Sequence, residues 1–230
     1  MTAADRPTST ATPRLDRDGE VFVLDLGDGE NRFHPDWVGA VDAALAEVEA
    51  TAGPRALVTT ATGKFFSNGL DLDWLGGHAD QFDAYLADAE RLFARALALP
   101  VVTVAAIQGH AFAAGAMLSL GHDFRVMRAD RGFWCLPEVD IDMPFTHGMT
   151  ALITARLSPQ TAHEAMVTGR RYGGTDALRA GIVDLAVPEH EVLPAAIELA
   201  RASASKAGTT LATIKTRLFE DALAELTTPR

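Results

Sequence analysis

Glu138 is the carboxylate in this sequence whose neighbours best suit proton transfer. It lies in the stretch GFWCLPEVDIDMPF, directly after Pro137 and close to Phe, Trp, Leu and Met. Apolar surroundings raise the pKa of a carboxyl group, and a general base that works near neutral pH needs such a pKa. An exposed loop acid beside Asp140 and Asp142 would have the same local pattern. The residue types alone therefore leave both interpretations of Glu138 open.

A second stretch points to chemistry in the backbone. In GKFFSNGLDLD, a predicted strand ends at Phe66, and the turn-forming residues Ser67, Asn68 and Gly69 follow it. This pattern is typical of a plain tight turn. A break in a strand can also aim a backbone N–H at a ligand, as in sites that bind a developing oxyanion.

A third stretch, AIQGHAFAAGAMLSLGHD at residues 106–123, ends a predicted buried strand at Gly109 and opens a helix with small residues. The first N–H groups of a helix are unpaired and carry partial positive charge, and small side chains let a ligand approach them. Close packing of a small-residue helix on a sheet explains the same residues. The glycine spacing is neither a dinucleotide fingerprint nor a phosphate loop, since no Lys-Ser/Thr pair follows the last glycine.

Composition excludes several classes of protein. The formal net charge of −11 and a pI of about 5.0 argue against nucleic acid or an anionic membrane as the partner. Cys135 is the only cysteine, and no pair of histidines stands at metal-ligand spacing with a carboxylate, so we expect neither a disulfide nor a metal. No apolar run approaches the roughly 20 residues of a membrane span, and the N-terminal residues lack a signal core. We expect a cytoplasmic protein.

The hydrophobic pattern alternates between strands and helices, which is typical of an α/β fold. Strands are predicted at 20–27, 54–61, 101–109, 122–130, 132–136 and 180–188, and helical segments at 34–50, 79–100 and 110–121. After residue 145 the pattern is helical apart from the one short strand. We therefore expect a flexible tail at 1–17, a folded core at 18–145, and a helical region at 146–230 that belongs to the same domain.

Taken together, the three stretches resemble the crotonase superfamily of enoyl-CoA hydratases and isomerases. That family has a strand ending in Phe-Ser/Ala-x-Gly-x-Asp-Leu, a later Asn/Gln-Gly-x-Ala-x-small-small-Gly before a helix, and then a Pro/Ser-Glu loop. The resemblance covers nearly the whole chain from Glu20. It implies a ββα spiral core with a helical C-terminal trimerisation region, and therefore a homotrimer or a hexamer made of two trimers.

The resemblance also assigns roles to residues. It implies that the backbone N–H groups of Asn68 and Ala114 form an oxyanion hole for the thioester oxygen of an acyl-CoA. The substrate is expected to contact the following residues: Phe66, Asn68, Gly69, Leu70, Asp71, Ala114 and Met117. Coenzyme A would enter as part of the substrate, with no separate cofactor.

One departure from the family narrows the reaction. Hydratases of this family carry a second glutamate three residues past the second oxyanion position, where this chain has Met117. The strings NRFHPD, GHAFAAGAML and PEVDIDMP look like monofunctional delta-3, delta-2-enoyl-CoA isomerases, especially the plant peroxisomal type. This likeness implies that Glu138 alone moves a proton from C2 to C4. The alternatives are a hydratase or another crotonase-type reaction and, in a different class, a non-catalytic acyl-CoA-binding protein.

Some side chains are candidates for secondary roles. Lys64 and Lys215 could meet the phosphates of coenzyme A or be solvated surface charges. Asp71 could cap a short helix that starts at Leu72. Four apolar residues could line an acyl pocket or belong to the core: Trp74, Met143, Phe145 and Met149.

Overall fold

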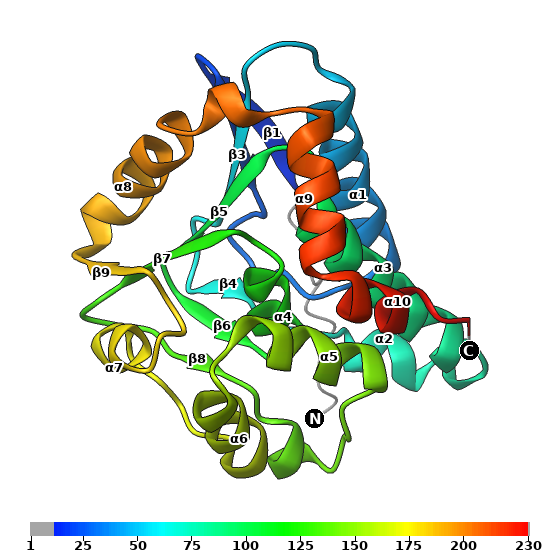
Figure 1. Ribbon diagram of the computed structural model, residues 1–230. Coiled ribbons are helices and arrows are strands. Elements are labelled where there is room, and N and C mark those ends of the chain that lie inside the picture. Colours follow the sequence, from blue (N-terminus) through cyan, green and yellow to red (C-terminus); the bar gives the residue numbers. More distant parts are fainter. Residues whose placement is uncertain (1–11, 230) are drawn as a thin grey trace, which may run out of the picture.

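Two β-sheets organise the chain in the computed structural model, which describes residues 12–229 (Figure 1). The larger sheet has the strand order β1-β2-β3-β5-β7-β9. Only the β1–β2 pair is antiparallel; the other neighbours are parallel. The strands are β1 (Arg14–Asp18), β2 (Val21–Asp25), β3 (Ala56–Thr60), β5 (Val102–Ile107), β7 (Phe124–Arg128) and β9 (Leu185–Val187).

Helices cover both faces of this sheet, as parallel strands require. Figure 1 shows α8 (Glu189–Arg201) on one side of the strands and α1 (Pro35–Ala50) with α3 (Phe82–Ala98) on the other. Every residue of β3 and β5 is buried, which explains their continuous apolar and β-branched sequence. One core cluster lies under α8, and the larger one lies on the side of α1 and α3.

The smaller sheet consists of three short parallel strands in the order β4-β6-β8. They are β4 (Phe65–Ser67), β6 (His110–Phe112) and β8 (Trp134–Cys135). The sequence pattern predicts a helical segment over the whole of residues 110–121, and this prediction is wrong at its start. The amide of Ala111 donates to the carbonyl of Phe133, so the first residues form β6, and α4 (Ala114–Leu120) begins only after them.

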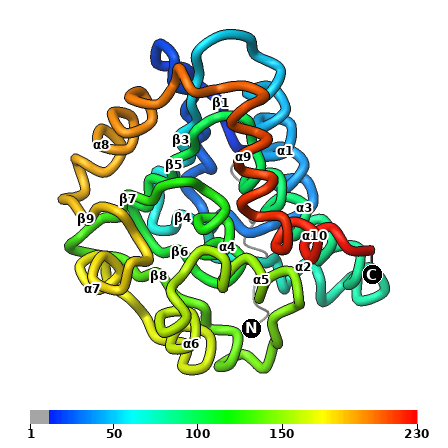
Figure 2. Tube along the Cα trace, in the orientation of Figure 1, coloured from blue at the N-terminus to red at the C-terminus, as the bar shows by residue number. Residues whose placement is uncertain are grey.

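The C-terminal third is helical except for β9. Its helices are α5 (His147–Arg156), α6 (Pro159–Thr168), α7 (Gly174–Arg179), α8, α9 (Thr209–Leu218) and α10 (Glu220–Thr227). Shorter elements along the chain are α2 (Leu72–Gly76) and the 3-10 turns η1 (Ala79–Gln81), η2 (Glu138–Ile141) and η3 (Ala204–Lys206). In Figure 2 the red end of the chain, α10, runs beside α3 and α5, which it contacts. Within residues 12–229, no helix is both long and apolar enough to cross a lipid bilayer.

The predicted tail at 1–17 needs a correction at its end. Residues 14–17 belong to β1, which pairs along its whole length with β2, from Arg14 opposite Asp25 to Asp18 opposite Val21. The strand lies at the edge of the sheet and is mostly exposed, so its polar sequence resembles a tail. Residues 1–11 lie outside the described residues.

Lys215 on α9 is buried, which contradicts both sequence interpretations of it. Only 3% of the residue is exposed, and its Nζ donates to Asp123 Oδ2 at 2.9 Å and to the Val101 carbonyl at 3.2 Å. Asp123 also accepts from the Thr103 amide at 2.8 Å. Burial lowers the pKa of Lys215, and the charge of Asp123 opposes that shift. The pair fastens α9 to the beginnings of β5 and β7.

We expect Lys215→Met to destabilise the protein by about 3 kcal/mol, because it leaves the charge of Asp123 partly buried without its cation. Urea unfolding followed by circular dichroism measures the loss. Lys206→Met is the matched control, since Lys206 is exposed, and it should change stability by less than about 0.5 kcal/mol. Equal midpoints for the two variants would contradict a role for the buried pair.

Candidate active site

A cavity of about 670 Å³ lies where the ends of the small sheet meet α3 and α5. Leu70, Ala114, Met117 and Glu138 all line it, so residues from the three sequence stretches meet in one place. The rest of the wall is mainly apolar and includes Leu86, Ile141 and residues 143–149. This is the form expected of a small-molecule site: an apolar concavity with a few convergent polar groups.

Glu138 is buried in the wall of this cavity. The residue is 5% exposed, and its Oε2 has no hydrogen-bond partner among the described residues. Desolvation raises the pKa of Glu138 to about 7, although a backbone hydrogen bond acts in the opposite direction. Glu138 is the first residue of the 3-10 turn η2, and its backbone carbonyl accepts from the Met143 amide at 3.1 Å, which holds the residue in place. Glu138 is thus a carboxyl group that can exchange a proton near neutral pH.

The turn after β4 has one free amide, and it is not that of Asn68. The Asn68 amide donates to the Glu30 carbonyl at 2.9 Å, the Gly69 amide to Ser67 Oγ at 3.2 Å, and the Asp71 amide to Tyr85 Oη at 2.7 Å. Leu70 N–H has no acceptor within residues 12–229. The assignment of Asn68 as a backbone donor to the substrate is therefore wrong for this structure, because the Asn68 amide already donates to the Glu30 carbonyl.

The second free amide is at the beginning of α4. Ala114 is the first residue of the helix, and its N–H has no acceptor in the described part of the chain. Ala113 precedes it with φ +50° and ψ −124°, a conformation that is strained for any residue but glycine. The Ala113 amide donates to the Cys135 carbonyl at 3.0 Å, which fixes this strained turn to β8.

Two glycines let the turn after β4 and the start of α4 touch through their backbones. A Cβ at Gly115 would lie 2.4 Å from the Ser67 carbonyl oxygen, and a Cβ at Gly69 would lie 3.1 Å from the Ala114 nitrogen. Gly69 also has φ +85°, which favours glycine. This close approach places the free amides of Leu70 and Ala114 at the same cavity, as an oxyanion hole requires.

The other predicted substrate contacts divide into two groups. Asn68, Leu70, Ala114 and Met117 line the cavity, whereas Phe66, Gly69 and Asp71 do not. Phe66 is fully buried in the larger core cluster. Asp71 accepts from the Trp74 amide at 3.2 Å and caps α2, which confirms that prediction.

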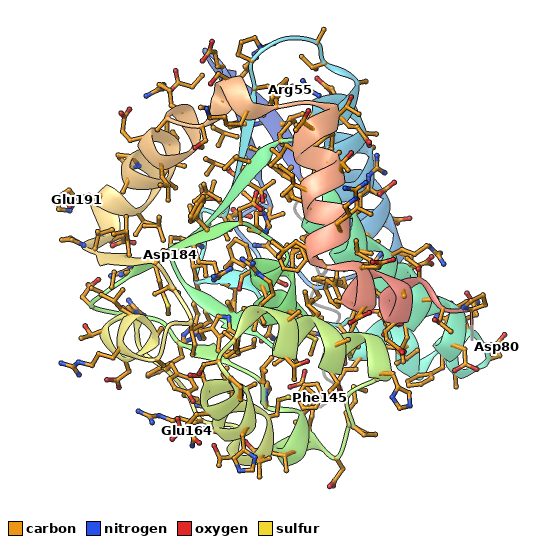
Figure 3. The ribbon with its side chains drawn as sticks, viewed as in Figure 1. Arg55, Asp80, Phe145, Glu164, Asp184 and Glu191 are labelled. Atoms are coloured by element: carbon orange, nitrogen blue, oxygen red, sulfur yellow. The ribbon has the colours of Figure 1, made fainter. Side chains whose placement is uncertain are left out.

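Three of the four predicted acyl-pocket residues line the cavity: Met143, Phe145 and Met149. Figure 3 shows Phe145 beside α5, on the segment that leads into that helix. Trp74 does not line the cavity and stacks instead on the His78 ring, with 4.2 Å between centroids. Lys64 is exposed, with its Nζ 5.1 Å from the centre of the Phe65 ring.

Sequence reasoning missed part of the wall. Phe82 and Leu86 of α3 line the cavity, as do Glu225, Thr228 and Pro229 at the C-terminal end. The spacing of Phe82 and Leu86 by four residues puts them on one helix face, which was a usable signal. The C-terminal residues gave no local signal. Within the described residues, no group of three or more His, Cys, Asp and Glu side chains could hold a metal ion.

Residues 18–230 match the family described as Enoyl-CoA hydratase/isomerase. The chain belongs to this family. It is 38% identical over 221 residues to the peroxisomal enoyl-CoA delta isomerase 2 of Arabidopsis thaliana, a match that covers 90% of this chain and 92% of the relative. The enoyl-CoA delta isomerase 3 of the same plant is 37% identical over 219 residues, again with 90% and 92% covered.

Solved structures of the family have the same fold. An apo enoyl-CoA isomerase of Mycobacterium tuberculosis superposes with a TM-score of 0.85 and 29% identity, over 93% of each chain. An enoyl-CoA hydratase of Mycobacterium ulcerans superposes with a TM-score of 0.87 and 27% identity, over 95% of this chain and 96% of that one. The predicted crotonase-like α/β fold with a helical C-terminal region is confirmed.

We expect Ala113→Gly to stabilise the protein by about 1 kcal/mol. Relief of about 1–3 kcal/mol of backbone strain exceeds the entropic penalty of about 0.4–1 kcal/mol that a glycine adds. The matched control is Ala116→Gly in regular α4 backbone, which should destabilise by at least about 1 kcal/mol, because the helix loses propensity and the core loses a buried methyl group. Thermal and urea unfolding of both variants measure the difference, and a less stable Ala113→Gly variant would rule out strain at this position.

Proposed function

We propose that this chain is an enoyl-CoA isomerase that moves the double bond of a 3-enoyl-CoA to the 2-trans position. The observation that carries the proposal is a single buried carboxyl group, Glu138, in the same cavity as two free backbone amides. Met117 lines this cavity where the hydratase pattern has a second glutamate, so that position supplies no carboxylate to activate water, and the other glutamate on the wall, Glu225, is exposed. The names of the plant relatives support the same activity.

In the proposed mechanism, ionised Glu138 removes a proton from C2 of the substrate. The electron pair of the broken C–H bond delocalises over the thioester carbonyl and the C3–C4 double bond, and the negative charge gathers on the thioester oxygen. The same carboxyl group then returns the proton to C4, and the double bond forms between C2 and C3. No water is added, and no electrons leave the substrate, so no redox cofactor is needed.

The backbone amides of Leu70 and Ala114 are proposed to bind the thioester oxygen. Leu70 replaces Asn68 in this role because its N–H is the unpaired one. Each donor stabilises the enolate more than the neutral thioester, since hydrogen bonds to a charged acceptor are stronger. Removing one such donor typically costs about 2.7–4 kcal/mol of transition-state stabilisation.

We further propose that the chain acts in the cytoplasm as a homotrimer or a hexamer, with coenzyme A entering only as part of the substrate. Ile214 and Leu218 on α9 support an assembly, since they are 55% and 69% exposed and lie one turn apart. A charge of −11 supports the absence of nucleic acid or an anionic membrane among the partners.

The central test assays 3-enoyl-CoA and 2-enoyl-CoA in parallel with wild type and Glu138→Gln. We expect isomerisation without hydration, and a decrease of about 10²–10⁴-fold in kcat for the variant, the usual contribution of general acid–base catalysis. The matched control is Asp140→Asn, an exposed acid two residues away, which should keep the wild-type rate. Fast hydration of 2-enoyl-CoA would favour a hydratase, and tight acyl-CoA binding without turnover would favour a binding protein.

The pH dependence of kcat/KM should follow the ionisation of Glu138. Because the base must be ionised, kcat/KM is expected to rise with pH and to level off above an apparent pKa of about 7. A stopped assay from pH 5 to 9 at constant ionic strength measures this profile. A flat profile across pH 6–8 would contradict a role for Glu138 as the base.

The same pKa has a consequence for stability. The pKa of Glu138 rises from 4.5 to about 7 on folding, so the folded state binds more protons than the unfolded state between these values. Stability should therefore fall as pH rises through this window. Glu138→Gln removes this pH-dependent loss of stability, so the variant should be more stable than wild type above pH 7. The difference in free energy of unfolding between the two proteins should vanish near pH 4.5.

A further inference from the structure

We propose that Tyr85 is a positioning residue that fixes the direction of the Leu70 N–H. The inference rests on the proposed function of that amide as an oxyanion donor. Tyr85 belongs to α3, is 3% exposed and does not line the cavity. It therefore acts through the backbone and does not touch the substrate.

The direction of the Leu70 N–H follows from the peptide that contains it. Gly69 C=O and Leu70 N–H belong to one peptide unit, and the described chain has no cis peptide bond. In a planar trans peptide these two groups point in opposite directions. Gly69 C=O accepts from the Phe33 amide at 2.9 Å, so Leu70 N–H points away from Phe33.

The Tyr85 hydroxyl joins the two segments on either side of this peptide. It donates to the Phe33 carbonyl at 2.8 Å and accepts from the Asp71 amide at 2.7 Å. The Tyr85 hydroxyl oxygen thus holds two residues. One is Phe33, whose amide orients Gly69 C=O, and the other is Asp71, which directly follows Leu70. Burial raises the pKa of Tyr85, so the hydroxyl keeps the proton that it donates.

The two sides of the turn differ in how much else restrains them. On the N-terminal side, Asn31 Nδ2 donates to the carbonyls of Phe65 and Phe66 at 3.1 and 3.0 Å, and Ser67 Oγ donates to the Asn31 carbonyl at 2.7 Å. On the C-terminal side, the Asp71 amide has the Tyr85 hydroxyl as its only acceptor in the described residues. The Asp71 carbonyl and side chain are held by α2, through the amides of Leu75 and Trp74 at 3.0 and 3.2 Å, but these bonds do not hold the Asp71 amide. Without the hydroxyl, that amide loses its acceptor, and the Leu70 peptide beside it is less firmly oriented.

The chain offers a matched pair of variants because it has two tyrosines, both buried and both with a hydrogen-bonded hydroxyl. Tyr85→Phe removes the hydroxyl at the turn. Tyr172→Phe removes a hydroxyl that donates to Glu164 at 2.7 Å. Tyr172 does not line the cavity. We expect Tyr85→Phe to lower kcat about 10- to 100-fold, less than the loss of a whole donor, with KM within about threefold. Tyr172→Phe should keep the wild-type kcat.

A spectroscopic readout separates positioning from a general loss of stability. The infrared carbonyl stretch of a bound 2-enoyl-CoA shifts to lower frequency when the oxyanion donors polarise it. This shift should decrease in Tyr85→Phe and stay at its wild-type value in Tyr172→Phe, at saturating ligand. An undiminished shift in Tyr85→Phe, or a kcat within twofold of wild type, would overturn the inference.

If Tyr85→Phe does not fold, 3-fluorotyrosine incorporated into the Tyr172→Phe background changes the hydroxyl at position 85 alone. The carbonyl shift should then differ between the fluorinated and the unlabelled protein, and equal shifts would overturn the inference. Failure of the proposed function is a separate outcome. A wild type that polarises the thioester without isomerising 3-enoyl-CoA would contradict the isomerase, and the infrared comparison would still test Tyr85.

Discussion

The contact on which the site depends is the backbone approach between the end of β4 and the first turn of α4. No side chain lies between them, since a Cβ at Gly115 would be 2.4 Å from the Ser67 carbonyl oxygen. A parallel pairing of β4 with β6 brings the two segments to the same edge of the small sheet. Because β8 pairs with the other side of β6, Glu138, three residues beyond β8, reaches the same cavity. The small sheet thus collects donors and base from stretches about 25 to 45 residues apart.

The cavity concentrates features that oppose folding. Ala113 has a backbone conformation suited to glycine, and Glu138 is buried without a partner for one carboxyl oxygen in the described part of the chain. Such features persist only where the surrounding structure compensates for them, and they are typical of functional sites. Here the compensation comes from hydrogen bonds that hold the backbone, including Ala113 to Cys135 and Asp71 to Tyr85.

A second polar region holds the helical third against the sheet. Arg156 of α5 donates to the carbonyls of Leu120, His122 and Asp123, while Lys215 of α9 pairs with Asp123. His122 is fully engaged, with Nε2 2.8 Å from Thr59 Oγ1, and burial lowers its pKa to about 4, so it is neutral. These bonds matter for the site because α5 and the residues after α10 form part of the cavity wall.

Local sequence determined the elements and most of the chemistry. The buried strands β3 and β5, the cap of α2 at Asp71, the carboxyl group at Glu138 and the apolar residue at Met117 all follow from residue type and spacing.

Tertiary structure decided which groups are available. Asn68 and Leu70 look equally suited to donate from a turn, and only the carbonyl of Glu30, 38 residues earlier, occupies the first and leaves the second free. Likewise β6 forms because the sequence-distant strands β4 and β8 supply its hydrogen-bond partners, and Lys215 is buried because Asp123 stabilises its charge. A backbone amide has the same chemistry at every position, so its function depends on which acceptors the fold brings to it.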